Sequence, residues 1–285
     1  MSKLTCSQDQ DELHKLISAV RAGDKAALES LLRALKDDIY GIALRMVAQP
    51  ADAEDVTQEV LLKVITRLDS FRGDSSPRTW AYRIAVNHIL DKRKSRVEQL
   101  GLDFEAFGKD LLNGLSEPAN SDQELAYEVK LGCTLAMLTC LDREHRVAYV
   151  LGEVFDLPGN VAAEIADVSQ EVYRQRLSRA RNQLEGFTEA FCGVVNPANT
   201  CSCQRRVLKA IELGRVNREN LVFSSHPTRA LKAKVEEMDQ LHSIASLMRS
   251  HPDYAAPDRI ISAIRDALHN GSLSIFRDSA LQHEP

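Results

Sequence analysis

The 285-residue sequence has no uninterrupted apolar run of about 18 residues, the length that spans a bilayer, so no membrane span is expected. Residues 1–10 are polar and lack the apolar core of a secretory signal, which makes the cytoplasm the expected compartment. The chain also lacks a phosphate-binding glycine loop, a nucleophile motif and a clear pair of carboxylates in a cleft. These absences argue against an enzyme.

Strand signals are almost absent as well, and no internal repeat or low-complexity tract is present. Apolar residues recur instead at helical spacing over most of the chain. We therefore expect an all-α protein with two small helical modules, a linker between them and a C-terminal helical extension. The expected boundaries are 10–96 for the first module, 97–121 for the linker, 122–190 for the second module and 191–285 for the extension.

Local signals place the first helices. Asp24 follows a glycine and is a plausible N-cap for a helix that carries apolar residues from Ala27 to Leu35. A separate helix is predicted from Ile39 through Val47, ending before Pro50. Further helices are predicted over 52–68, 80–96, 105–112, 122–154, 160–166, 170–191, 203–213, 227–249 and 257–269.

The net charge of −5 is mildly acidic and does not by itself indicate a nucleic-acid binder. Net charge averages over faces, however, whereas a polyanion responds to the local field. Basic residues cluster at 78–96 and 174–181, and acidic residues gather at 51–59 and 122–128. Two basic helical segments about eighty residues apart suggest a protein that contacts DNA at two spaced sites.

The segment 157–181 fits a helix-turn-helix. Asp167 would lie in the tight turn, a position that often holds glycine, and Ser169 would cap the second helix. That helix would bury Val172, Tyr173 and Leu177. Its outward residues suit base edges and phosphates in a major groove, namely Gln170, Glu171, Arg174, Gln175, Ser178, Arg179 and Arg181. The alternative is an ordinary amphipathic hairpin with a solvated basic face.

The segment 52–96 begins with acidic residues, which favour a helix N-terminus but also leave Asp55, Gln58 and Glu59 as an exposed patch suited to a basic protein surface. Aromatic and basic residues follow, including Phe71, Arg72, Trp80, Tyr82 and Arg83. Such a mixture suits the unstacked bases of single-stranded DNA. The alternative places Phe71 and Trp80 in the core.

In combination these segments resemble extracytoplasmic-function (ECF) sigma factors of the sigma-70 family. Three segments resemble their region two: 52–60 (DAEDVTQEV), 71–76 (FRGDSS) and 78–87 (RTWAYRIAVN). Three more resemble their region four: 141–146 (LDREHR), 164–166 (EIA) and 176–181 (RLSRAR). The resemblance covers residues 10–190 and implies a subunit that directs promoter recognition and DNA melting at the start of transcription.

The resemblance also implies roles for individual residues. Core RNA polymerase would contact Asp55, Gln58 and Glu59. The −10 element of promoter DNA would contact Arg72, Trp80, Arg83, Asn87 and Lys92, and the −35 element would contact Arg174, Gln175, Ser178, Arg179 and Arg181. The linker would thread toward the polymerase active site and RNA-exit channel. Two departures are Asp167, where the turn usually has glycine, and Pro77, which puts the geometry of the −10 loop in doubt.

The extension opens with Cys192, Cys201 and Cys203, which could bind zinc or another thiophilic metal, or sense oxidation. His226, His242 or His251 could supply a fourth ligand. The alternative is a set of buried thiols at a helical junction. Cys133 and Cys140, seven residues apart, are expected to line one helix face in a core. No cofactor is certain from the sequence.

The extension is about as long as a soluble anti-sigma module, and its apolar helices need a surface to cover. We expect it to regulate in cis by holding the two modules so that a DNA or polymerase surface is covered, with or without a separate anti-sigma factor. Truncation after Gly186 should then raise promoter-specific transcription. The competing function is a stand-alone helix-turn-helix regulator with a metal- or redox-sensing cysteine cluster, which would explain only 157–181 and the cysteines.

Overall fold

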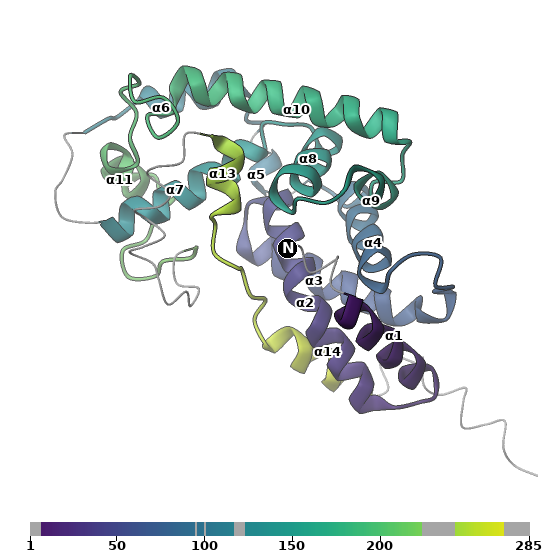
Figure 1. Ribbon diagram of the computed structural model, residues 1–285. Coiled ribbons are helices and arrows are strands. Elements are labelled where there is room, and N and C mark those ends of the chain that lie inside the picture. The colour runs from purple at the N-terminus through teal and green to yellow at the C-terminus, as the bar shows by residue number, and fades with distance from the viewer. Residues whose placement is uncertain (1–6, 95, 100, 117–122, 224–242, 271–285) are drawn as a thin grey trace, which may run out of the picture.

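The computed structural model describes residues 7–94, 96–99, 101–116, 123–223 and 243–270, and every regular element within these ranges is helical (Figure 1). The all-α prediction is therefore confirmed. The N-terminal module contains α1 (Ser7–Arg21), α2 (Lys25–Val47), α3 (Pro50–Thr66) and α4 (Pro77–Asp91), with a 3₁₀ turn at Leu68–Ser70.

The linker carries α5 (Arg96–Gln99) and α6 (Phe104–Leu112). The second module contains α7 (Gln123–Leu138), α8 (Arg143–Tyr149), a π-helical turn η3 (Val150–Val154), α9 (Gly159–Ile165) and α10 (Gln170–Phe191). The extension contains α11 (Cys203–Glu212), α13 (Ile244–Arg249) and α14 (Arg259–His269). Within the ranges that the structure describes, no helix is both long and apolar enough to cross a membrane.

Side-chain caps explain where several helices begin. The carboxylate of Asp24 accepts hydrogen bonds from the backbone amides of Ala26 and Ala27, at 2.8 and 3.1 Å, as predicted. The hydroxyl of Ser169 accepts from the amide of Val172 at 3.2 Å and starts α10. Both predicted N-caps are confirmed, so these helix starts are encoded locally.

One prediction about the N-terminal module is wrong. The sequence predicted a helix ending near Leu35 and another starting at Ile39, whereas α2 continues from Lys25 to Val47. The polar residues between them include no glycine or proline, so nothing there ends a helix. Lys36 is buried where the extension packs on α2, and its ammonium donates to the carbonyl of Ala256 at 2.8 Å. The polar residues between Leu35 and Ile39 therefore do not end the helix, and one of them binds a distant segment of the chain.

A large apolar core runs through both modules and into the extension. Its fully buried members include Leu31 of α2, Leu61 of α3, Leu184 of α10 and Ile261 of α14. A second, smaller cluster joins α7 to α11. The apolar surface of each part is therefore covered by the other parts, and burial of this kind is the main source of folding free energy.

The modules meet where α9 lies against α4 and where α7 and α8 lie against α2. The extension touches both modules, because α13 contacts η3 and α10 whereas α14 contacts α2 and α3. Figure 1 shows α10 along the upper edge of the molecule and α14 at the other end, beside α2. The extension thus bridges the two modules on a face away from the outer side of α10.

Candidate nucleic-acid interface

Hydrogen bonds fix both ends of the loop before α4. Ser76 caps α4 by accepting from the amide of Thr79, and Pro77 occupies the first turn, where its missing N–H costs no hydrogen bond. Arg21 of α1 donates to the carbonyl of Leu68 at 2.7 Å and thereby braces the start of the loop. The doubt raised by Pro77 is resolved for the helix start, because proline is well suited to that position.

Only part of the predicted aromatic platform is accessible. Phe71 and Tyr82 are buried, whereas Trp80 is half-buried and packs its ring 5.3 Å from that of Phe71. Arg72 is exposed beside them. Arg78, by contrast, is buried and forms ion pairs with carboxylates of α1 and α2, so its role is structural. A base could stack here on Trp80 alone, with Arg72 nearby.

Arg83 of α4 points toward the second module. Its guanidinium donates to the carboxylate of Asp167, in the turn between α9 and α10, at 2.5 Å. Asp167 adopts a left-handed backbone conformation with φ of 54°, as its place in the turn predicted. Asp167 therefore does more than replace glycine, because it holds a side chain predicted to contact the −10 element.

We expect Asp167→Gly to free Arg83 while leaving the turn intact. Glycine removes the cost of the left-handed conformation, and the lost ion pair is about half exposed on both sides, so unfolding free energy should change by less than about 1 kcal/mol. Affinity for a single-stranded oligonucleotide, measured by fluorescence anisotropy, should rise. Adding Arg83→Gln should remove the gain; a gain that survives this second change would contradict the assignment.

The other predicted residues of α4 lie further along the helix. Asn87 is half-buried. Lys92 donates to both carboxylate oxygens of Glu59 on α3, at 2.9 Å each. Glu59 also accepts a hydrogen bond from His88 at 2.6 Å. Desolvation acts to raise the pKa of Glu59, but the hydrogen bonds from Lys92 and His88 outweigh it and lower the pKa.

The acidic patch of α3 is only partly open. Asp55 is exposed, whereas Gln58 and Glu59 are half-buried. Their neighbour Glu54 forms an ion pair with Arg259 of α14. The extension therefore reaches the edge of the surface predicted to face polymerase.

The helix-turn-helix places its residues largely as predicted. Tyr173 is buried and donates to the carbonyl of Ala148 at 3.0 Å, and Gly152 allows that approach, because a Cβ there would lie 2.6 Å from the tyrosine hydroxyl. Leu177 is also buried. The prediction for Val172 is wrong, since its side chain is 38% exposed on the outer face. Val172 lies in the first turn of α10, where its side chain is open to solvent.

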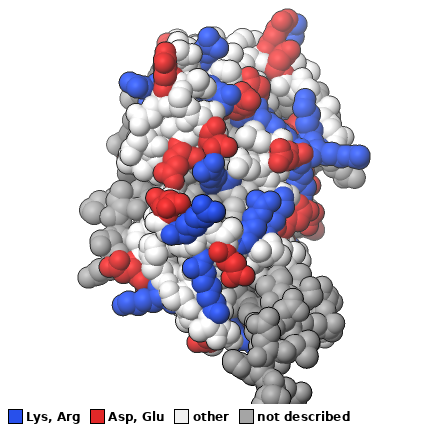
Figure 2. All heavy atoms as spheres, turned by 90° about the vertical axis from the view of Figure 1, so that its right-hand side faces the viewer, with Lys and Arg blue, Asp and Glu red and all other residues white. Residues whose placement is uncertain are grey.

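The outer face of α10 carries the predicted duplex-reading residues. Arg174, Gln175, Ser178 and Arg179 are exposed, and so is Arg181, which forms an ion pair with Glu153. Figure 2 views the molecule from the right of Figure 1 and shows basic and acidic side chains alternating. Among the described residues that face the viewer there, the basic side chains form no continuous patch. Ion pairs such as Arg83–Asp167 place an acid of one module beside a base of the other.

Several arginines that connect distant parts of the molecule were not predicted from the sequence. Arg146 of α8 donates to the carboxylate of Glu98 in α5 at 2.9 Å and to the carbonyl of Met46 in α2. Arg143 donates to the other oxygen of Glu98 at 2.7 Å and to the carbonyl of Ile89 at the end of α4, also at 2.7 Å. Glu98 thus joins the linker to α8 of the second module, and the same two arginines contact carbonyls of the first module. The segment LDREHR carried the resemblance, but nothing local to it revealed these partners.

Arg45 of α2 is also buried. Its guanidinium lies over the rings of Phe155 and Tyr254, 5.3 Å from each ring centre, and donates to the carbonyl of Gly41 at 3.0 Å. Burial lowers the pKa of Arg45. One residue each from the first module, the second module and the extension therefore meets at this cation.

The linker is packed rather than extended. Its helix α6 places Phe104 and Phe107 against Phe187 of α10, with ring centres 5.3 and 5.6 Å apart. Arg206 of α11 donates to the carboxylate of Asp110 at 3.1 Å. The short helix predicted at 105–112 is present, and both the second module and the extension hold it.

The cysteine set gives no assembled metal site among the residues that the structure describes. Cys201 is buried, and desolvation raises its pKa to about 11, which opposes the thiolate that metals and oxidants require. Cys192 and Cys203 are half-buried. His251 is enclosed between Thr134 and Tyr254, at 2.8 and 3.0 Å. His226 and His242 lie outside the described residues, so the metal or redox role stays a prediction.

Comparisons with known proteins agree on one family. The family described as sigma-70 region 2 matches residues 31–98. The chain is 30% identical over 186 residues to the RNA polymerase sigma-H factor of Pseudomonas aeruginosa, covering 63% of this chain and 94% of that protein. It is also 30% identical over 174 residues to the ECF RNA polymerase sigma-E factor of Escherichia coli, covering 60% and 91%.

A solved structure of CnrH in complex with the cytosolic domain of CnrY is similar at 21% identity and a TM-score of 0.46, covering 64% of this chain and 97% of that one. A likeness this weak supports no argument about the arrangement of the modules. The sequence relatives carry the assignment instead.

Proposed function

The chain belongs to the extracytoplasmic-function family of RNA polymerase sigma factors, and from that premise we propose that it alternates between a closed and an open form. In the open form α3 would dock on core RNA polymerase through Asp55, Gln58 and Glu59. The loop and face of α4 would then take the −10 element, and α10 would take the −35 element. The described arrangement corresponds to the closed form.

Three contacts support a closed form. The turn at Asp167 lies on Arg83 of the −10 helix, so an incoming strand would have to displace it. Glu98 pairs with the half-buried Arg143 and the buried Arg146 of α8, and these arginines also donate to carbonyls of the first module. The linker helix α6 packs on α10 and pairs with Arg206 of α11, whereas a linker that threads into polymerase must leave both.

The position of α14 carries the proposal that the extension regulates in cis. This helix packs on α2 and α3, and its Arg259 pairs with Glu54, one residue from Asp55. A protein surface docking on α3 would meet α14 at that edge. The extension would thus act in place of, or together with, a separate anti-sigma factor.

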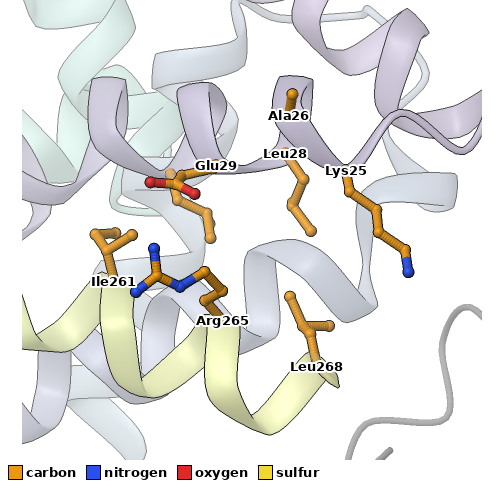
Figure 3. Close-up of a pocket in the computed structure, with 8 residues that line it drawn as sticks. Lys25, Ala26, Leu28, Glu29, Ile261, Arg265 and Leu268 are labelled. Carbon is orange, nitrogen blue, oxygen red and sulfur yellow. The ribbon is translucent and has the colours of Figure 1, made fainter. Parts of the chain in front are cut away.

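The seam beneath α14 is incompletely filled. A cavity of about 220 Å³ lies between α2 and α14 (Figure 3). Leu28 and Glu29 of α2 line one side, and Ile261, Arg265 and Leu268 of α14 line the other. Side chains that border this open pocket have fewer packing partners, which makes α14 suited to release.

We assign no catalytic step to this chain, and we place its action in the cytoplasm with polymerase. Each base captured on Trp80 or a neighbouring surface gains about 1–3 kcal/mol of stacking, which offsets a similar cost of unstacking. Contacts to phosphates add salt-dependent affinity without reading sequence. Promoter opening would therefore be a balance that a few captured bases shift.

Co-purification with core RNA polymerase, followed by run-off transcription from genomic fragments, tests the proposed function. We expect the chain to bind core polymerase and to direct it to specific start sites. A chain that binds duplex DNA at palindromic sites but never polymerase would be the stand-alone regulator instead, and no observation on this chain favours that alternative.

A further inference from the structure

Four side chains connect the surface proposed for polymerase to the surface proposed for DNA. Glu59 and Lys63 are one turn apart on α3, and His88 and Lys92 are one turn apart at the end of α4. The ammonium of Lys63 lies 2.7 Å from Nδ1 of His88, and Nε2 of His88 lies 2.6 Å from Glu59. Lys92 completes the set with its two contacts to Glu59.

The distances define how protons are arranged in this set. Lys63 carries only donors, so Nδ1 of His88 accepts and Nε2–H donates to the carboxylate of Glu59. Partial burial lowers the pKa of His88 despite that carboxylate, consistent with a neutral ring. His88 is therefore a positioning residue that orients Glu59 toward Lys92.

Two of these four side chains are exposed enough for polymerase and DNA to reach them. The side chains of Glu59 and Lys92 are 45% and 31% exposed, whereas that of His88 is 11% exposed. A basic side chain of a docking protein can reach the same carboxylate oxygens that now bind Lys92. Because a carboxylate shared between two cations attracts each less strongly, the ammonium of Lys92 becomes available to a phosphate.

We propose that Glu59 tethers Lys92 in the free chain and that docking of polymerase on α3 releases Lys92 for a backbone phosphate of the −10 strand. This rests on the proposed function, since it takes α3 as the polymerase surface and α4 as the DNA surface. It deepens that function by making DNA contact at Lys92 conditional on polymerase. His88 and Lys63 hold the carboxylate of Glu59 in the orientation that binds Lys92.

The salt dependence of binding to a labelled single-stranded oligonucleotide of mixed sequence measures the release. One additional phosphate contact on a single strand steepens the slope of log K against log salt by about 0.7. In the free full-length chain, Glu59→Gln should steepen the slope by about that amount and raise affinity roughly two- to fivefold, as for one exposed ion pair. Glu59→Gln keeps the shape of the side chain, and its unfolding midpoint checks that the fold persists.

Asp55→Asn is the matched control. It removes one carboxylate from the same face of α3, but Asp55 forms no ion pair with any residue that the structure describes. Its slope should stay at the wild-type value, and Glu59→Gln combined with Lys92→Met should return to that value. An equal steepening in Asp55→Asn, or a steepening that survives Lys92→Met, overturns the tether.

The second arm repeats the measurement with the chain bound to core RNA polymerase. Lys92→Met should leave the slope of the free chain unchanged and reduce that of the complex by about 0.7. The same reduction in both states overturns the conditional release. A wild-type chain that does not bind polymerase defeats the proposed function instead, and the free-chain measurements still decide whether Glu59 holds Lys92.

Discussion

Glu98→Ala is expected to lower the free energy of unfolding by about 3–5 kcal/mol. The Glu98 carboxylate is 4% exposed and is the shared partner of Arg143 and Arg146. Burial acts to lower the pKa of Arg146, and Glu98 opposes that shift, so removing Glu98 leaves a guanidinium charge without its carboxylate. Urea denaturation followed by circular dichroism measures the loss.

Glu105→Ala is the control for that change. Glu105 lies in the same linker and pairs with Lys109, but its side chain is 78% exposed, so its loss should cost less than about 0.5 kcal/mol. If the two variants unfold at similar denaturant concentrations, the carboxylate of Glu98 does not join the modules. Two separate transitions in Glu98→Ala would show that the modules unfold independently once it is gone.

Removal of the extension is expected to raise promoter-specific run-off transcription about tenfold, which corresponds to a closed form favoured by about 1.4 kcal/mol. The cut belongs after Cys192 rather than after Gly186, because Phe187 and Phe191 pack with each other and Phe187 packs on the linker helix. The truncated chain loses α11, α13 and α14 and therefore uncovers α7, η3, α10, α2 and α3.

A point variant distinguishes the release of α14 from the other effects of deleting the whole extension. Ile261 is 1% exposed in the seam with α2, so Ile261→Asp should undock α14 and raise transcription in the full-length chain. Ala263→Asp introduces the same charge at an exposed position of the same helix and should change nothing. Equal transcription from all forms would rule out autoinhibition, and lost transcription in the truncated chain would indicate that the extension activates.

The sequence predicted those features that depend on neighbours along the chain. Asp24 and Ser169 act as N-caps and Asp167 occupies the left-handed turn, because helix propensity, capping and turn chemistry are local. The same reasoning failed at Val172, whose side chain is open to solvent.

The predicted site was incomplete for a related reason. Arg83 and Lys92 were predicted as DNA contacts from their own helix, but their present partners, Asp167 and Glu59, lie 84 and 33 residues away. Single-sequence patterns carry no information about such pairs. Glu98 was missed for the same reason, because a lone acid in a linker is usually solvated.

The buried Arg45 couples the separation of the second module from α2 to the separation of the extension from α2. Its cation is shielded from water by Phe155 of the second module and Tyr254 of the extension, so departure of either part admits solvent to the same charge. Water that reaches the guanidinium then replaces the lost contact with the first ring, and the cation–π attraction to the second ring becomes weaker. Opening of this sigma factor should accordingly be cooperative, with half-open intermediates scarcely populated and a steep response to whatever first lifts one part away.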